Sequence, residues 1–438
     1  MKVMSKATLG LMIIVFLFLT SCSSIVTSEL QIDLGETINT VTPETASGNS
    51  ENTVIEDTED PEMIYPQKWA TGDGTAEYPW ANDCIQKAYD ACPTGGTIFL
   101  RAGYYQLAGI FNITKQINII GEGIDNTIIK TADTYGLHIS EVDYVTIKGL
   151  TVDGIAQTRT PIVASSSGHL GAEVYRYCIG IGGSNYISLE DIEAKNGSGF
   201  GIDANNDNHL SFHNIYAHDN GDHGIHPGNS ILGRNTCNTY RDIYCWNNRL
   251  EGFGDATDVI DPNEIGNTYD NLQCWDNGMH GIVIVGHNGV LSNSSASGNG
   301  KNEIYSVKAN GIYLAGCENF NVNDCYADLT AGEGLEIINS KNVNLTNVII
   351  KNNNVSDTDG IGGIFIENSS NINFISCQSY DDRNTPLQFY GMMVTWDSAD
   401  ISLLNCILMP NEIAAIYNPS GVVIVEKAVN AEAMLPRL

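Results

Sequence analysis

A repeat within residues 215–287 constrains the fold of this chain more than any other feature. Three times an alternating apolar stretch ends in Asn, three residues follow, and Gly with an apolar residue begins the next stretch. Asn220–Gly224, Asn248–Gly252 and Asn277–Gly281 carry this frame, with periods of 28 and 29 residues. A period of about 20 to 50 residues built from short strands is typical of a solenoid, whose coils bury apolar surface against their neighbours. The sequence therefore predicts an all-β solenoid.

Length and composition agree with this interpretation. The chain has 438 residues, long for one compact core but ordinary for a solenoid. Its 44 glycines recur in Asn-Gly, Asp-Gly and Gly-Gly pairs, which predict many turns. Further coil starts are predicted at Gly136, Gly201, Gly311, Gly334, Gly363 and Gly391.

The charge balance excludes one class of partner. There are 52 acidic against 21 basic residues, a formal net charge of −31. Nucleic-acid binding depends on Lys and Arg at phosphates, so no nucleic-acid partner is expected. The same balance opposes long-range attraction of a polyanionic glycan, unless a local basic patch or bridging cations override it.

The first residues predict a targeting segment. Lys2 and Lys6 precede the apolar run Ala7–Leu19, which is short for a transmembrane helix. Leu19-Thr20-Ser21-Cys22 then resembles the lipobox of prokaryotic lipoproteins. The resemblance implies a signal peptide at 1–21, lipidation of Cys22, and an extracytoplasmic protein that a lipid anchors to the membrane, on the cell surface or the periplasmic side. An ordinary secretory signal is the alternative.

The rest of the chain divides in two. Residues 22–64 are rich in Ser, Thr, Asp and Glu, which predicts a disordered acidic tether. Residues 65–438 form the solenoid domain. It begins with an amphipathic helix at Trp80–Ala91 and a strand at Thr97–Arg101. This order, with Gly-Asp-Gly before it, resembles the N-terminal cap of the pectate-lyase-like superfamily. The resemblance implies a single-stranded right-handed parallel β-helix with an N-terminal capping helix.

Two repeat positions have a structural interpretation. Asn196, Asn299 and Asn353 are expected in the same turn position as Asn220, Asn248 and Asn277, forming an asparagine ladder. Three residues earlier, one inward-facing column is predicted from Ala194, Ala217, Cys245, Cys274 and Ala296. Cys245 and Cys274 would lie one coil apart, either as stacked thiols or as a disulfide.

Three successive coils carry the candidate site. The first contains His223 and His226, the second Asp255, and the third His280. Coils stack about 4.8 Å apart, so side chains two coils apart can reach one sugar ring. His218 and His287 are expected on exposed turns instead.

In these coils the chain resembles the catalytic module of mannuronan C5-epimerases and related alginate lyases. That family carries Tyr-Gly-Phe-Asp-Pro-His, then Gly-Phe and an Asp, then His-Gly-Phe. Its Tyr falls on His223, its Asp on His226 and its Pro on Pro227. Its later His falls on His280, and its second-coil Asp lies near Asp255. Its remaining first-coil His falls on Gly228, so two functional positions of the family differ here.

The resemblance implies abstraction of the proton on C5 of a uronic acid in a polysaccharide substrate. Histidine suits this role because its pKa lies near neutrality. We expect His226 and His280 to be the candidates for the acid and base roles, in either order, with His223 in support. Arg234, Arg241 or Arg249 could bind the substrate carboxylate. Asp255, Asp258 and Asp261 could hold Ca²⁺, although a solvated loop is the simpler interpretation of these three residues.

Two other function classes remain open from the sequence. Polygalacturonase-like glycoside hydrolases share the predicted fold, and Asp203 with Asp222-His223-Gly224 partly matches their pattern. A non-catalytic glycan-binding surface β-helix is the other alternative, with Trp246 and Trp275 as a sugar-stacking strip or as ordinary packing. The sequence predicts no particular oligomeric state.

Overall fold

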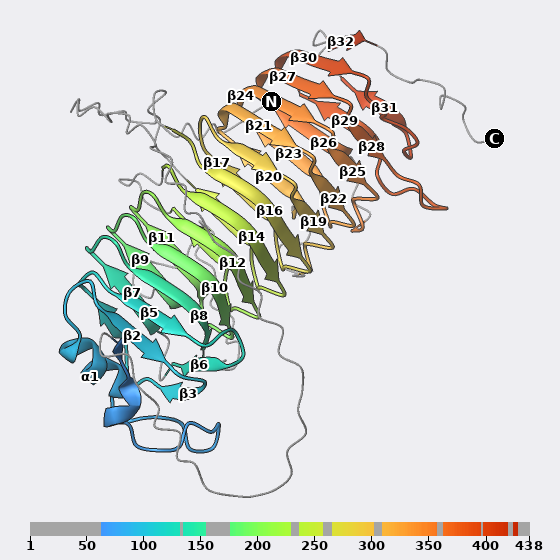
Figure 1. Ribbon diagram of the computed structural model, residues 1–438. Coiled ribbons are helices and arrows are strands. Elements are labelled where there is room, and N and C mark those ends of the chain that lie inside the picture. The colour runs from blue at the N-terminus through green and yellow to red at the C-terminus, as the bar shows by residue number, and fades with distance from the viewer. Residues whose placement is uncertain are drawn as a thin grey trace, which may run out of the picture. The chain divides into compact units, whose positions relative to one another are not determined.

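The computed structural model describes residues 63–131, 135–154, 176–228, 236–256, 265–301, 309–356, 362–395, 397–418 and 424–427. All of them belong to one compact unit, Glu59–Leu438. Parallel strands stack coil upon coil through this unit, with one short helix at its N-terminal end (Figure 1). The predicted single-stranded parallel β-helix is confirmed.

The strands form two sheets. The 12-stranded sheet contains β4 (Phe111–Ile113), β7 (Tyr135–Ser140), β9 (Tyr177–Gly182), β11 (Phe200–Asn205), β13 (Ile225–Pro227), β15 (Phe253–Ala256), β17 (Ile282–Val285), β20 (Ile312–Ala315), β23 (Leu335–Ile338), β26 (Gly362–Glu367), β29 (Tyr390–Val394) and β31 (Ala414–Tyr417).

The 20-stranded sheet covers the rest of each coil. Its members are β1 (Met63–Ile64), β2 (Thr97–Leu100), β3 (Gly103–Gln106), β5 (Asn118–Gly121), β6 (Thr127–Lys130), β8 (Thr146–Asp153), β10 (Ser188–Lys195), β12 (Ser211–His218), β14 (Thr239–Trp246), β16 (Thr268–Trp275), β18 (Val290–Ser292), β19 (Ser295–Ser297), β21 (Glu318–Asn323), β22 (Tyr326–Asp328), β24 (Lys341–Thr346), β25 (Ile349–Lys351), β27 (Ser370–Ile375), β28 (Gln378–Tyr380), β30 (Ala399–Leu404) and β32 (Ile424–Lys427).

The long strands of the 20-stranded sheet bend at one residue each. Asp191, Asn214, Asp242 and Asn271 have positive φ angles between 52° and 56° in the middle of β10, β12, β14 and β16. Asn and Asp tolerate this left-handed conformation better than other side chains. Successive residues on either side of the bend alternate between core and surface, so every coil contributes Ile, Leu, Phe or Val to one continuous core.

An asparagine ladder supports the turn between the two sheets. The Nδ2 of Asn220 donates to Oδ1 of Asn248, Asn248 donates to Asn277, and Asn277 donates to Asn299, each at 3.0 Å. All four are buried. Asn353 occupies the same turn position in a later coil, where its Oδ1 accepts hydrogen bonds from the backbone N–H and the hydroxyl of Thr330.

The prediction for Asn196 was wrong by one residue. Gly197 occupies the ladder position and donates its N–H to Oδ1 of Asn220. Asn196 instead has φ 55° in the preceding turn position, where its side chain donates to Asp153 at 2.8 Å. Asp219 and Asn247 have the same left-handed conformation one and two coils later, so a polar αL residue precedes each ladder position.

The inward column of small side chains is confirmed. Ala194, Ala217, Cys245, Cys274 and Ala296 are paired in register on successive strands. Cys245 and Cys274 are buried free cysteines, so the stacked-thiol interpretation holds.

The N-terminal cap differs from its prediction at one boundary. Helix α1 spans Cys84–Ala91 and buries Cys84, Ile85, Ala88 and Tyr89 against the first coils. It does not begin at Trp80, because Asn82 and Asp83 have positive φ and Trp80 pairs with Tyr105 of β3. A 3-10 helix, η1 (Pro66–Trp69), precedes it.

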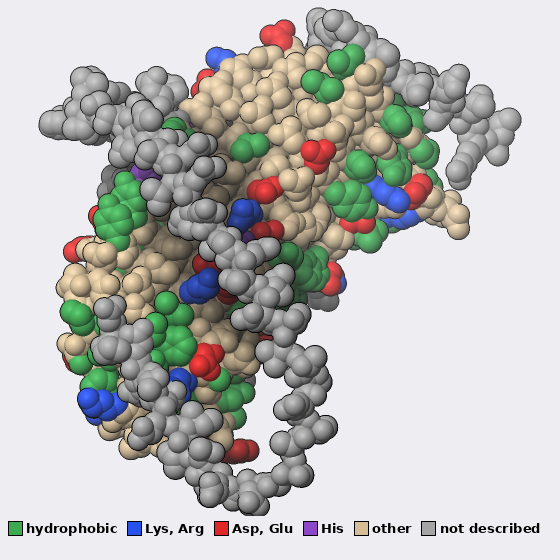
Figure 2. All heavy atoms as spheres, viewed as in Figure 1, with side chains coloured by type: hydrophobic (Ala, Val, Ile, Leu, Met, Phe, Trp, Pro, Cys, Tyr) green, Lys and Arg blue, Asp and Glu red, His purple; other side chains and the backbone are tan. Residues whose placement is uncertain are grey.

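Charged side chains are interspersed on the surface. In Figure 2, Lys and Arg lie among Asp and Glu on the visible face. Within the part of the chain that the structure describes, no helix is long and apolar enough to cross a membrane. The predicted signal peptide, Cys22 and almost all of the tether lie outside the described residues.

Candidate functional site

One column of polar side chains precedes three strands of the 12-stranded sheet. Ile225, Phe253 and Ile282 are paired in register on β13, β15 and β17. His223, Glu251 and His280 stand two residues before them, so they occupy the same position on successive coils. The repeat frame explains this placement, since each directly precedes the glycine that opens its strand.

His223 lies between two carboxylates. Its Nδ1 is 2.5 Å from Oδ1 of Asp222, and its Nε2 is 2.8 Å from Oε2 of Glu251. Burial alone would lower the pKa of His223, but the charges of Glu251 and Asp222 outweigh it and raise the pKa to about 10. Burial likewise opposes ionisation of Glu251, yet His223 holds the Glu251 pKa at about 2. His223 is therefore an imidazolium at neutral pH.

His226 has a different environment. It stands on β13 in register with Asp203 of β11, and its Nδ1 lies 3.1 Å from Oδ1 of Asp203. Phe200 stacks on the imidazole with ring centroids 5.0 Å apart, and the side chain is only 6% exposed. In the neutral form of the ring, a carboxylate at Nδ1 places the proton on Nδ1 and the lone pair on Nε2. Asp203 in turn accepts a hydrogen bond from Asn205 at 2.9 Å.

His280 is neutral for a local reason. The backbone N–H of Asn310 donates to its Nδ1 at 2.9 Å, and Tyr313 stacks on the ring at 5.2 Å. Burial lowers the pKa of His280, and the charge of Glu251 only partly offsets this. Because Nδ1 accepts a hydrogen bond, the ring proton is on Nε2. His280 is thus a hydrogen-bond donor, which fits the acid role of the predicted acid/base pair.

The structure brings the three histidines together in three different hydrogen-bonding environments. The rings of His223 and His226 are 4.7 Å apart, and Glu251 connects His223 electrostatically to His280. Gly254 lies beside these rings and has no side chain. A Cβ added at this position would lie only 3.2 Å from Cδ2 of His223, so a larger residue would crowd the ring. The cluster can supply a base at His226, a fixed positive charge at His223 and a neutral donor at His280.

The arginines predicted to bind the substrate carboxylate do not gather at the histidine cluster in the part of the chain that the structure describes. Arg241 lies on β14 of the other sheet, where it contacts His213 at 3.1 Å and Asp242 at 3.5 Å, so it is not part of this cluster. Arg249 is in the turn before β15, and its backbone N–H bonds to Asn220. Arg234 lies outside the described residues.

Trp246 and Trp275 form a stack on β14 and β16. Their rings are 5.0 Å apart and within 5° of parallel, and His218 covers the other face of Trp246 at 4.0 Å. Both faces of Trp246 are therefore occupied, so this residue cannot stack on a sugar. Trp275 has one indole face in the stack, and its register partner on the other side is Ser297.

Of the three acidic residues expected to hold calcium, the structure describes only Asp255, and its environment does not suit a metal ligand. Asp255 is fully buried and accepts hydrogen bonds from Tyr269 at 2.6 Å and Asn267 at 2.9 Å. Its carboxylate faces the core because Phe253 and Asp255 alternate with outward Gly254. Asp258 and Asp261 lie outside the described residues, and no metal-binding group of three side chains occurs among the described ones. We assign no chemical step to calcium.

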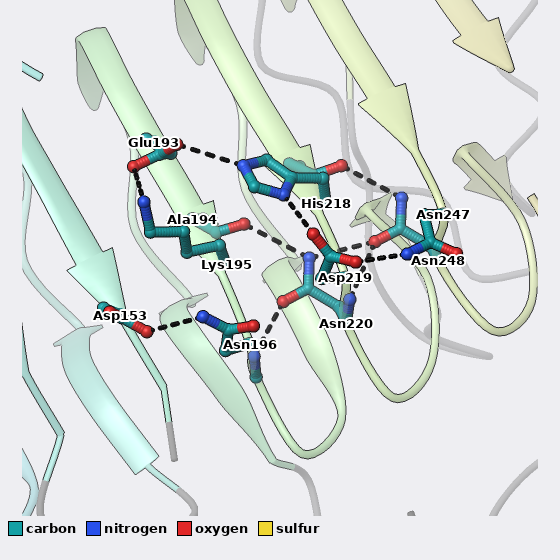
Figure 3. Close-up of polar contacts among 12 residues, drawn as sticks. Asp153, Glu193, Ala194, Lys195, Asn196, His218, Asp219, Asn220, Asn247 and Asn248 are labelled. Atoms are coloured by element: carbon teal, nitrogen blue, oxygen red, sulfur yellow. Dashed lines mark hydrogen bonds and ion pairs between the residues drawn. The ribbon is translucent and has the colours of Figure 1, made fainter. Parts of the chain in front are cut away.

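His218 is buried, which contradicts the expectation of an exposed turn. Its two ring nitrogens contact Asp219 at 2.7 Å and Glu193 at 3.0 Å (Figure 3). Burial opposes protonation of His218, but Glu193 and Asp219 raise its pKa overall. Lys195 contacts Glu193 at 2.6 Å in the same network. His287 is also mostly covered and lies 3.8 Å from Glu318.

Sequence reasoning missed Glu251 and Arg176. The repeat frame contained the signal for Glu251, because it holds the position of His223 and His280. Arg176 directly precedes Tyr177 of β9, and its backbone carbonyl accepts from Phe200, the residue that stacks on His226. Its Nε is buried without a hydrogen-bond partner among the described residues.

Comparison with known proteins places the fold. The model of the right handed beta helix region matches residues 301–430. The chain is 27% identical over 212 residues to the mannuronan C5-epimerases AlgE2 and AlgE5 of Azotobacter vinelandii, a match that covers 44% of this chain. It spans about one fifth of the length of these relatives.

Solved structures agree. The A-module of mannuronan C-5 epimerase AlgE6 of Azotobacter vinelandii has a TM-score of 0.62 at 16% identity, covering 84% of this chain and 98% of the module. PfbA, a surface adhesin of Streptococcus pneumoniae, has a TM-score of 0.56 at 12% identity, covering 83% of this chain and 93% of the adhesin. The protein is a right-handed parallel β-helix that resembles the epimerase modules.

Proposed function

We propose that this protein acts on a polysaccharide by removing the C5 proton of a uronic acid, as a lyase or a C5-epimerase. The observation that carries this proposal is the His226–Asp203 pair, which directs the free lone pair of His226 to Nε2. The similarity to proteins named mannuronan C5-epimerases supports the choice of reaction.

The proposed reaction begins with a proton transfer from C5 of the sugar to a histidine. The C5–H bond breaks and the proton passes to Nε2 of His226, while the electron pair spreads into the adjacent carboxylate. The imidazolium of His223 offsets part of the carboxylate charge of Asp222 and Glu251 beside the reacting carbon. In a lyase the C4–O bond then breaks and an acid donates a proton to O4, whereas in an epimerase an acid on the opposite face donates a proton to C5.

The substrate carboxylate needs a cationic partner, because the side chains around the histidine cluster are mostly acidic. Asp203, Asp222 and Glu251 all belong to the cluster, so His223 is already compensated. We assign this role to Arg176, whose backbone carbonyl accepts from Phe200 beside His226 and whose Nε has no hydrogen-bond partner among the described residues. A carboxylate is the natural ligand of such a group, because a guanidinium binds it through paired hydrogen bonds.

The test is an assay of the full chain on alginate, pectate and other uronans, with and without Ca²⁺. Ultraviolet absorbance reports unsaturated chain ends, and proton NMR reports inversion at C5. We expect activity that His226→Ala abolishes and that the control His213→Ala, on the other sheet, retains. Reducing ends without unsaturation would instead indicate a glycoside hydrolase, and inactivity on every polymer would contradict the enzyme proposal and favour a surface glycan-binding protein.

The cellular location belongs to the same proposal. The lipobox-like Leu19–Cys22 would place the β-helix outside the cytoplasm on a lipid anchor, where extracellular polysaccharide is accessible.

A further inference from the structure

We propose that Trp275 forms a second glycan-binding subsite, on the 20-stranded sheet and separate from the histidine cluster. Its ligand is a pyranose ring whose C–H face stacks on the indole. This inference does not depend on the proposed reaction, since it uses none of the residues of the cluster.

Trp275 is the last ring of an aromatic stack. His218, Trp246 and Trp275 are paired in register on β12, β14 and β16. Their rings are nearly parallel, with interplanar angles of 11° and 5°, so each ring covers the next along the coil axis. His218 and Trp275 are the two end rings of the stack among the described residues: the outer register partner of His218 is Lys195, and that of Trp275 is Ser297.

The next coil places a small side chain beside Trp275. Ser297 is its register partner, one coil spacing of about 4.8 Å away. A serine side chain has one heavy atom beyond Cβ and cannot cover an indole. Ser297 therefore leaves part of the Trp275 ring uncovered, in agreement with the half-buried side chain of Trp275, and we infer a space beside Ser297 at this overhang.

Polar side chains border this space. Asp276 comes directly after Trp275, and its carboxylate lies over Gly298. A Cβ added at Gly298 would be 2.8 Å from Oδ1 of Asp276. Lys301 contacts the same Oδ1 at 2.6 Å, and the side chains of Lys301 and Asp276 are 58% and 46% exposed. The overhang is thus bordered by a hydroxyl, a carboxylate and an ammonium group.

This combination fits a sugar better than an apolar ligand. A pyranose presents C–H groups on its faces and hydroxyl groups around its edge. An indole face contacts the former, while carboxylate and ammonium groups exchange hydrogen bonds with the latter. Because Asp276 and Lys301 compensate each other, the subsite requires no net charge on the sugar.

The test is affinity electrophoresis of the full chain in native gels containing alginate, polygalacturonate or glucomannan, with polymer-free gels as reference. We expect retardation by at least one polymer, and about tenfold weaker binding in Trp275→Leu. Ser297→Leu should weaken binding similarly, because it fills the space under the indole without removing the ring. Thermal unfolding of each variant checks that it is folded.

Two further variants separate the possible outcomes. Trp246→Phe keeps the stack and should bind normally, because neither face of Trp246 reaches the ligand. The turnover of His226→Ala and the binding of Trp275→Leu are measured separately, so that loss of the proposed reaction is distinguishable from loss of this subsite. Unchanged binding in Trp275→Leu, equal loss in Trp246→Phe, or no retardation by any of the three polymers would overturn the proposal.

Discussion

The protonation state of each histidine depends on which groups touch its two nitrogens. His223 has a carboxylate on each side, His226 has one on Nδ1, and His280 accepts a backbone N–H. Three chemically identical side chains thus become a cation at His223, a ring oriented through Nδ1 at His226 and a neutral donor at His280. The local partners decide this, because one hydrogen bond fixes the tautomer of a neutral imidazole.

Asp203 is expected to act as a positioning residue for His226. In Asp203→Asn the side chain loses its charge and can donate to Nδ1, which moves the ring proton to Nε2 and removes the base. The turnover number should fall roughly 100-fold or more while KM changes little. Steady-state kinetics across pH on the uronan that proves active would measure this.

Asp207 provides the control for that substitution. It is fully buried near Asp203, and burial raises its pKa to about 8, so its carboxyl is mainly neutral at pH 7. Asp207→Asn should therefore retain activity. An equal loss in both variants would show that the effect is structural and does not come from His226.

The His223–Glu251 ion pair should make stability depend on pH in a definite direction. The folded pKa of His223, about 10, is above its ordinary value, so its stabilisation is complete below pH about 6.5 and is lost as pH rises toward about 10. The folded pKa of Glu251, about 2, is below its ordinary value, so its stabilisation is lost as pH falls below about 4.5.

Glu251→Gln should flatten the alkaline part of this profile. The unfolding temperature of the unmodified chain is expected to fall by a few degrees between pH about 6.5 and 10, and by less in the variant. Scanning calorimetry at several pH values measures this. Glu318→Gln, which alters a longer carboxylate–histidine contact with His287, is the matched control and should keep the original slope.

At the scale of the element, the asparagine ladder holds each turn to the next. Asn248 accepts from the backbone and side chain of Asn220 and donates to Ala217 and Asn277. These bonds are buried, so removing the amide of Asn248 leaves several polar groups without partners. Figure 3 shows the contact between Asn220 and Asn248. The ladder also fixes the turns that hold His223, Glu251 and His280 just before β13, β15 and β17.

Asn248→Ala should lower the free energy of unfolding by about 2 to 4 kcal/mol. Asn247→Gly changes the neighbouring residue, whose φ of 51° glycine also adopts, and should cost less than about 1 kcal/mol. Thermal and denaturant unfolding of both variants would measure the difference. Similar losses in the two would show that the ladder position has no special role.

At the scale of the whole molecule, the solenoid separates two surfaces. The histidine cluster lies on the 12-stranded sheet, whereas the indole stack and the His218 network lie on the 20-stranded sheet. A long polysaccharide could contact both, which would raise its apparent affinity through effective concentration. The first surface carries the proposed chemistry and the second the proposed accessory binding.

Attachment to a membrane is expected from the first residues alone. Cys22→Ser removes the predicted lipidation site, so the variant should move from the membrane fraction to the aqueous phase on detergent phase partition of cells that express the full chain. The unmodified chain should remain in the detergent phase. Aqueous partition of both would contradict the lipid anchor and favour an ordinary secretory signal.

The sequence by itself determined the coil frame, because the positions of Asn, Gly and small residues repeat with the period of the backbone. Asn220, Asn248 and Asn277 predicted the ladder, and Ala194 to Ala296 predicted the inward column. It also placed His223, His226 and His280 near one another, because register converts a sequence period into a distance.

Only the tertiary structure decided what each side chain meets. Asp255 faces the core and not a metal, Arg241 lies on the other sheet, and Trp246 has both faces covered. The proton positions of the three histidines depend on contacts with Asp203, Glu251 and Asn310, which lie 23 to 30 residues from their partners. These outcomes come from burial and from neighbours across coils, and no local pattern in the chain encodes them.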